Sequence, residues 1–309
     1  MVLTVTLNVA IDKRYVVDDF KVNEVNRVLE CDYQPGGKGI NVSKAAKLAG
    51  ASVTATGFIA GYAGGYVENE LRKRDINCEF IKVPGESRSC INIFDTKHKT
   101  QTEFLEPGVT VTRDHELDLL EKFEALVRDH DIVTISGSAP AGTSDDIYSE
   151  LIAIAKKHGK KVILDTSGQR LIDGIKAKPT LIKPNIDEIQ MLAGRRINGQ
   201  DDLIDIGKKI QANGIEFVVI SLGKDGSVII ADEGIYRAIP PKIEAVNTVG
   251  CGDTMTAGFA IGLKKGLKLV DTIRLATAIS AASAMRAETG YFKKEDMEEL
   301  YDKVEILKL

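Results

Sequence analysis

The chain has 309 residues, which is long enough for one large α/β domain or for two ordinary domains with buried cores. Its 41 Lys and Arg against 45 Asp and Glu give a net charge of -4, which excludes a global positive field that would draw the protein to nucleic acid or to an anionic membrane. The four cysteines form no C-x-x-C pair, and no apolar run is typical of a signal peptide or a transmembrane helix. We therefore expect a reduced, cytoplasmic protein without a zinc site or a disulfide framework.

The predicted elements alternate between strands and helices along the chain. A strand is expected at 2–9 and a helix at 39–48, which Gly50 ends. Further strands are predicted at 53–58, 132–135, 161–164, 180–182 and 217–221, and further helices near 65–74, 114–128, 145–158 and 201–213. Repeated strand-then-helix units predict a mostly parallel sheet with helices on both faces.

Two segments break this alternation. Residues 12–33 and 88–105 alternate polar and apolar side chains without intervening helices, which predicts a small β layer attached to the main sheet. Such a layer can close over a ligand as a lid or pair with another subunit. Residues 227–231 and 235–238 predict a hairpin, and 275–284 predicts a tightly packed helix of small residues. Because no long linker interrupts the chain, we expect one domain over 1–309.

A glycine-rich turn precedes the helix expected at 39–48. The run Pro35-Gly36-Gly37-Lys38-Gly39-Ile40-Asn41 offers backbone N–H groups to an anion. Lys38 and Asn41 are three residues apart, so both can point to the same side of the first helical turn. A flexible connection with a solvated lysine is the alternative. The run is not a Walker A loop, because G-x-x-x-x-G-K-[ST] is absent.

Polar motifs follow several of the predicted strands. They are residues 136–140, the run Lys183-Pro184-Asn185-Ile186-Asp187-Glu188, and residues 221–226. Asn185 and Glu188 can hold water or Mg²⁺ against phosphates, or they can cap a helix with an acidic first turn. The other two motifs are equally compatible with plain turns. Since ligand sites of parallel sheets lie at the carboxyl ends of the strands, all of these motifs can face one edge.

The run Gly250-Cys251-Gly252-Asp253 opens a predicted helix. Free N–H groups at a helix start attract anions, and an adjacent Asp can deprotonate a hydroxyl that attacks a bound phosphate. Alternatively, Asp253 merely caps the helix. The run does not complete a dinucleotide-binding fingerprint, because residue 255 is Met rather than Gly.

Together and in this order, the motifs resemble those of the ribokinase-like sugar kinases, in particular the phosphofructokinase-B branch with 1-phosphofructokinases and tagatose-6-phosphate kinases. Residues 6–12 are similar to the N-terminal sugar motif of that branch, 36–42 to its first signature and 247–253 to its second. Two positions depart from the pattern: Val9 replaces the usual Pro, and Cys251 replaces the usual Ala or Ser. Because a helix start lowers a thiol pKa, we expect Cys251 to be sensitive to oxidation in the free enzyme.

The resemblance implies a three-layer α/β/α sandwich with a mostly parallel central sheet and a small β-sheet lid, and a homodimer that forms through this lid. It also implies an ATP- and Mg²⁺-dependent kinase that converts a ketohexose monophosphate, fructose 1-phosphate or tagatose 6-phosphate, to the bisphosphate. Residues 85–91 and 287–291 resemble tagatose-6-phosphate kinases, whereas 39–43 resemble 1-phosphofructokinases. A 6-phosphofructokinase of the same family and a non-catalytic regulator that binds nucleotide or sugar phosphate are the alternatives.

The resemblance also assigns roles to individual residues. Asp253 would be the general base, and the backbone of Gly250, Cys251, Gly252 and Asp253 would form an anion hole. The sugar phosphate would be bound by Asp12, Gly37, Asn41 and Ser138 at the sugar and by Lys38 and Arg88, with Arg27, at its phosphate. The nucleotide would be bound by Lys183, Asn185, Ser221, Gly223 and Ser280. Glu188 would organise Mg²⁺ through water, and Asp165 would join that polar network.

Overall fold

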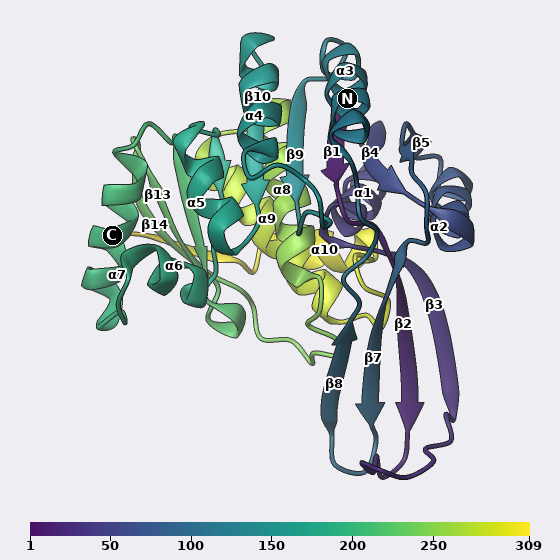
Figure 1. Cartoon of the computed structure of the whole chain (residues 1–309). Coiled ribbons are helices and arrows are strands. Elements are labelled where there is room, and N and C mark those ends of the chain that lie inside the picture. Colours follow the sequence, from purple (N-terminus) through teal and green to yellow (C-terminus); the bar gives the residue numbers. More distant parts are fainter.

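The computed structural model describes residues 1–309 and contains a large central sheet (Figure 1). The strands of this sheet follow the order β15-β14-β13-β12-β11-β10-β9-β1-β4-β5, and β6 pairs with β4. Their bounds are β1 Val2–Thr6, β4 Val53–Ile59, β5 Asn77–Cys78, β6 Ile81–Lys82, β9 Ile132–Ser136, β10 Lys161–Asp165, β11 Leu181–Ile182, β12 Phe217–Ser221, β13 Ser227–Ala231, β14 Gly234–Ile239 and β15 Glu305–Lys308. Strands from β12 to β5 pair in parallel, and β12 to β15 form an antiparallel edge. The predicted mostly parallel sheet is confirmed.

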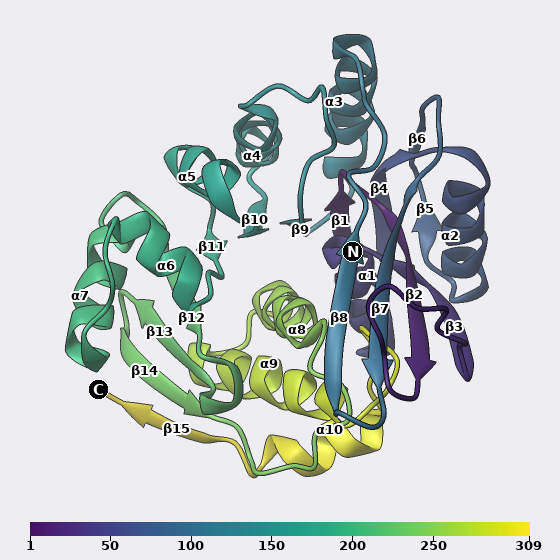
Figure 2. The ribbon, with the colours of Figure 1, turned by 60° about the horizontal axis from the view of Figure 1, so that its bottom comes forward.

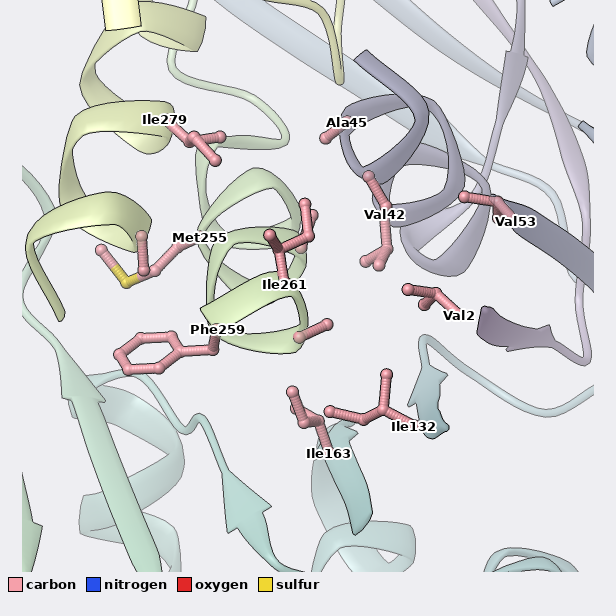
Figure 3. Packing of buried hydrophobic residues seen from close by; sticks show 14 of the residues in the cluster. Val2, Val42, Ala45, Val53, Ile132, Ile163, Met255, Phe259, Ile261 and Ile279 are labelled. Atoms are coloured by element: carbon pink, nitrogen blue, oxygen red, sulfur yellow. The ribbon is translucent and has the colours of Figure 1, made fainter. Parts of the chain in front are cut away.

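Helices cover both faces of the central sheet (Figure 2). One layer contains α1 Lys38–Leu48, α2 Gly61–Lys73, α8 Cys251–Lys265, α9 Leu269–Ala284 and α10 Lys294–Tyr301, and the other contains α3 Arg113–Val127, α4 Ile147–Lys157, α5 Gly168–Lys176, α6 Ile186–Ala193 and α7 Gly199–Gln211. Successive strand residues point to opposite faces, so Ile132 of β9 joins the core of the first layer and Val133 joins that of the second. Figure 3 shows part of the first core, with Val42 from α1, Ile261 from α8 and Ile132. The predicted three-layer sandwich is confirmed.

A second, four-stranded sheet projects from the main body (Figure 1). It is built from β2 Ala10–Val17, β3 Glu30–Gly36, β7 Arg88–Asp95 and β8 Thr100–Leu105 in the order β3-β2-β7-β8. Its strands lie within and just beyond the segments 12–33 and 88–105, in which the sequence pattern predicts a β layer. The register pairs Asp12 with Cys90, and Asn92 with Glu103. Because side chains alternate between faces, these residues share the face that borders the cavity described below.

Apolar periodicity predicts neither α5 nor α6, and only the capping alternative at Asn185 indicates a helix start at α6. Both helices are short, and α5 contains Gly168 and Gly174, which are weak helix formers. Helix α6 has only eight residues, so its apolar face is too short to show a helical period. The acidic residues of its first turn are therefore the clearer sign of a helix start. No helix of the structure combines the length and the apolar character that crossing a membrane requires.

Candidate active site

A cavity of about 370 Å³ lies between the small sheet and the carboxyl edge of the central sheet. Its lining includes most of the residues that the sequence assigns to the sugar phosphate and to the base: Asp12, Gly37, Lys38, Asn41, Arg88, Ser138, Gly250 and Asp253. Arg27 is not part of the lining, because it is exposed in the connection between β2 and β3. The structure therefore brings residues from the N-terminal third and from the start of α8 into one space.

Helix α8 begins at this cavity with a free helix terminus. Gly250 precedes the helix in a left-handed conformation, with φ of 79°, which favours glycine. The N–H groups of Gly252 and Asp253 have no acceptor within the protein, so they remain available to an anion. Asp253 does not cap the helix. Its carboxylate accepts a hydrogen bond from Nδ2 of Asn41 at 2.9 Å, and the side chain is only 6% exposed.

The environment of Asp253 suits a general base. Burial raises the pKa of its carboxyl to about 6, while the positive charge of Lys38 and the hydrogen bond from Asn41 oppose this rise. The group is therefore ionised near pH 7 and is a stronger base than an ordinary aspartate. A hydroxyl bound in the cavity can lose its proton to this carboxylate.

A buried carboxylate holds two lysines at the start of α8. Asp165 ends β10 and contacts Nζ of Lys38 at 3.2 Å and Nζ of Lys183 at 3.0 Å, and it accepts a hydrogen bond from the hydroxyl of Thr256 at 3.0 Å. Burial favours the neutral acid, but the two ammonium groups hold the pKa of Asp165 well below its usual range. A Cβ atom on Gly252 would lie 3.2 Å from Nζ of Lys183, so this cation lies against the free helix terminus.

Two expected roles concern residues of this cluster, and both remain predictions. Asp165 was assigned by resemblance to the Mg²⁺ network, but two lysines and a hydroxyl already use its oxygens. Lys38 was assigned to the phosphate already on the sugar, but its ammonium group joins the Asp165 cluster beside α8. The pKa of Lys38 is raised above its ordinary value, chiefly by Asp165, so the side chain stays charged.

The small sheet supplies the opposite wall of the cavity. Burial raises the pKa of Asp12 to about 6, against the positive charges of Lys44 and Arg88. Arg88 donates from Nε to the carbonyl oxygen of Asn8 at 3.3 Å and from Nη1 to that of Glu106 at 3.3 Å. These bonds fix the guanidinium at the rim of the cavity, where it can bind a phosphate.

Asn8 belongs to the site, although neither the motifs nor the family resemblance predict a role for it. It lines the cavity, and its Nδ2 donates to the carbonyl oxygen of Pro107 at 3.0 Å and to Oγ of Ser138 at 3.4 Å. Asn8 lies within the motif at 6–12, and this position is the sequence feature that could have identified it as a site residue. Asn92 and Glu103 also line the cavity, and only the register of the small sheet shows this.

The residues assigned to the nucleotide lie at the ends of neighbouring strands. Asn185 and Ser221 form a β-bridge between the ends of β11 and β12, and a Cβ atom on Gly223 would meet no other atom within 4 Å. Asn185 and Glu188 form a reciprocal capping box at the start of α6, so the alternative interpretation of this motif as a helix cap is correct. Ser280 lies elsewhere: its hydroxyl donates to the carbonyl oxygen of Cys251 at 3.0 Å, which joins α9 to α8.

The expected lowering of the Cys251 thiol pKa is wrong. Burial and the neighbouring carboxylate of Asp253 raise the pKa of its thiol to about 12, although the residue begins a helix. The thiolate that oxidants attack is therefore scarce at neutral pH. Here the loss of hydration and the negative charge of Asp253 raise the pKa of the Cys251 thiol by more than the helix terminus lowers it.

Comparisons with known proteins agree over the whole chain. The family model of the pfkB family carbohydrate kinases matches residues 5–296. Tagatose-6-phosphate kinase of Staphylococcus epidermidis is 34% identical over 318 residues, with 100% of both chains covered. Phosphofructokinase-2 from Escherichia coli, solved in complex with potassium, has a TM-score of 0.92 at 26% identity, with 98% of each chain covered. A possible 1-phosphofructokinase from Thermotoga maritima has a TM-score of 0.88 at 30% identity, with 100% of this chain and 99% of that chain covered.

Proposed function

The chain belongs to the pfkB family of carbohydrate kinases and is a phosphotransferase that acts on a sugar hydroxyl, and we propose that it uses ATP to convert a ketohexose monophosphate to the bisphosphate. The single observation that carries this proposal is the position of Asp253. Its carboxylate lies at a free helix terminus, is held by Asn41, and borders the cavity that Arg88 also lines. The names of the relatives, a tagatose-6-phosphate kinase and two phosphofructokinases, support the same class of acceptor.

The cavity offers complementary groups to both ends of such an acceptor. Oδ1 of Asn41 is buried without a hydrogen-bond partner, and a sugar hydroxyl would supply the missing donor. Asp12 would accept from a second hydroxyl, and Ser138 would contact the sugar from the end of β9. The Arg88 guanidinium would bind the phosphate already on the sugar, because its planar fork matches phosphate oxygens.

Phosphoryl transfer would take place at the start of α8. The acceptor oxygen forms a bond to the γ-phosphorus while the bond from that phosphorus to the β–γ bridging oxygen breaks, and ADP leaves. The hydroxyl proton passes to the Asp253 carboxylate. The free N–H groups of Gly252 and Asp253 donate to oxygens of the transferring group, and Lys38 and Lys183 stabilise its negative charge.

The nucleotide would lie along Asn185, Ser221 and Gly223, where the open strand ends support the expected binding position. Glu188 fits a Mg²⁺ ion held through water, because its Oε2 accepts from the backbone of Asn185 and its Oε1 makes no hydrogen bond within the protein. The structure contains no group of three or more His, Cys, Asp or Glu that could hold a metal, which suits an ion bound mostly by phosphate oxygens and water. When bound, Mg²⁺ would neutralise phosphate charge.

The test compares acceptors in one assay. Purified protein is mixed with ATP and Mg²⁺ and with fructose 1-phosphate, fructose 6-phosphate or tagatose 6-phosphate, and ADP release is measured. We expect turnover on fructose 1-phosphate or tagatose 6-phosphate. Preferred turnover on fructose 6-phosphate would instead assign the chain as a 6-phosphofructokinase. ATP binding without turnover on any acceptor would refute the enzyme and favour a non-catalytic regulator.

We also propose that the outer face of the small sheet pairs with the same face of a second chain. Tyr15, Tyr33, Ile93 and Phe104 share this face according to the strand register. Tyr33 is 47% exposed and Phe104 is 52% exposed, which leaves a large apolar surface in contact with water. The phosphofructokinase-2 from Escherichia coli has been solved in a tetrameric inhibited form, which supports self-association in this family.

A further inference from the structure

Lys44 is a buried lysine that the mechanism above does not use. It lies in α1 and is only 2% exposed. Its ammonium group donates to two backbone carbonyl oxygens, those of Pro35 at 3.1 Å and Thr289 at 2.7 Å, and to no carboxylate. A buried charge without a paired countercharge is costly, and burial lowers the pKa of Lys44 to about 8. An apolar residue would fill this position in an ordinary helix core.

The position of Lys44 within α1 relates it to the site. Lys38, Asn41 and Lys44 are spaced three residues apart, so they follow one side of the helix. Lys38 contacts Asp165, Asn41 contacts Asp253, and Lys44 contacts Thr289. These three residues on one side of α1 thus contact three separate parts of the active site.

One partner of Lys44 belongs to the segment that supports the anion hole. A Cβ atom on Gly250 would lie 2.5 Å from Cγ2 of Thr289, so this segment is in close contact with the turn that opens α8. A Cβ atom on Gly290 would lie 2.9 Å from Cε of Lys44, so the same segment is also packed closely on the lysine. Lys44 and Gly250 thus pack on the same segment, residues 289 and 290, from two sides.

The other partner belongs to the base of the small sheet. Pro35 lies near the end of β3, and the next residue, Gly36, has the Asp12 side chain directly against it. A Cβ atom on Gly36 would lie 2.1 Å from Cγ of Asp12, so this carboxylate packs directly on the backbone of the strand end. The bond from Lys44 to Pro35 thus fixes the position of Asp12 relative to α1.

We propose that Lys44 is a positioning residue that ties the base of the small sheet to the anion hole, so that Asp12 and Asp253 remain aligned on one acceptor molecule. This inference rests on the proposed function, and it adds a role for a residue that contacts neither substrate. Removal of the lysine would let the two walls of the cavity separate. Binding of the sugar phosphate and its orientation for transfer would then both suffer, whereas the nucleotide side at β11 and β12 would be unaffected.

The charge of Lys44 gives the proposal a second, independent readout. The groups that act electrostatically on Lys44 are Asp12 from β2, Glu288, Arg74 from the end of α2, and Asp253 from α8. Lys44 in turn lowers the pKa of Asp12 against the effect of burial, together with Arg88 from β7 and against Glu103 from β8. Loss of the lysine charge should therefore raise the pH at which Asp12 becomes ionised.

The test uses the full chain and compares Lys44→Met with Lys47→Met, a control on the same helix whose side chain is partly exposed. Thermal unfolding establishes that each variant is folded. For Lys44→Met we expect kcat/KM for the sugar phosphate to fall by about tenfold or more. We expect KM for ATP to change less than about twofold and the acid limb of the kcat/KM profile to move to higher pH. Lys47→Met should match the wild type.

A second variant keeps the test decisive if Lys44→Met does not fold. Lys44→Gln keeps N–H donors on a side chain that is one bond shorter but removes the charge, so its acid limb should move in the same direction. Wild-type kcat/KM and an unmoved acid limb in a folded Lys44 variant would overturn the proposal. Equal losses for sugar phosphate and ATP without a pH shift would also overturn it, since they indicate general structural damage. An inactive wild type would instead refute the proposed function.

Discussion

The substitution Asp253→Asn removes the proposed base and preserves the shape of the side chain. The asparagine oxygen can still accept the hydrogen bond that Nδ2 of Asn41 donates at 2.9 Å, so the buried contact survives. Loss of a general base typically lowers kcat by about 10²- to 10⁴-fold. This corresponds to about 3 to 5 kcal/mol of transition-state free energy. Because the change leaves Lys183 and the strand ends at Asn185 untouched, affinity for ATP should stay within about threefold of the wild type.

Asp253→Asn should lower turnover but should leave the folding stability unchanged or increase it. The pKa of Asp253 is raised from 3.8 to about 6 in the folded protein. The folded state therefore holds a proton that the unfolded chain releases between these pH values, and stability falls as the pH rises through about 6. Above that pH the ionised group costs the fold up to about 3 kcal/mol, at 1.36 kcal/mol per pKa unit. Asp253→Asn should thus unfold at an equal or higher temperature than the wild type at pH 7.5.

Three measurements check this prediction together. Steady-state turnover gives kcat, calorimetric titration with ATP gives affinity, and a thermal melt at pH 7.5 gives stability. Asp118→Asn, an exposed change on α3, is the matched control and should leave all three values unchanged. A kcat within tenfold of the wild type would refute the role of Asp253 as the base. Loss of ATP binding, or a clearly lower melting temperature, would point to a structural role.

Three further predictions concern the two buried carboxylates, Arg88 and the outer face of the small sheet. The value of kcat/KM for the sugar phosphate should fall below about pH 6, because burial raises the pKa of both Asp12 and Asp253 to about 6 and both must be ionised; a profile that stays flat to pH 5 would contradict this. Arg88→Met should raise KM for the sugar phosphate by roughly 10- to 100-fold, the loss typical of a charge-assisted hydrogen bond, and an unchanged KM would mean that another group binds the phosphate. The double variant Ile93→Glu and Phe104→Glu should convert a sedimenting dimer to a monomer, and a wild type that already sediments as a monomer would exclude the dimer.

Much of the main scaffold could be predicted because its signals are local. Strands β9 and β12 are runs of apolar residues, and helices with apolar faces follow or precede them at the spacing of βαβ units. Even β11, with only two residues, lies within the strand predicted at 180–182, and it pairs with β10 and β12 on either side. Apolar periodicity does not reveal the short helices α5 and α6, because too few turns carry an apolar face, and only the capping alternative at Asn185 indicates the start of α6.

The residues of the candidate site also fall into those that the sequence could predict and those that it could not. Asp12, Asn41 and Asp253 lie in motifs whose resemblance to a family supplies their roles, and the structure brings all three to one cavity. Asn92 and Glu103 were missed because strand alternation reveals which residues share a face, whereas the pairing of the two strands depends on their register. The thiol pKa of Cys251 was predicted in the wrong direction, because a rule about helix starts contains no information on burial.

Lys38 illustrates how tertiary contacts refine a motif. The family resemblance assigned it to the phosphate of the sugar, but its carboxylate partner, Asp165, is 127 residues away in sequence. Asp165 holds Lys38 and Lys183 before any substrate arrives, so two positive charges already lie at the start of α8 in the free protein. A preorganised field of this kind needs no rearrangement when charge develops on the transferring group, which is where electrostatic catalysis is most effective. Asp165 balances only one of the two lysine charges, which lowers the cost of burying Lys183, and the cluster keeps a net positive charge beside the helix start.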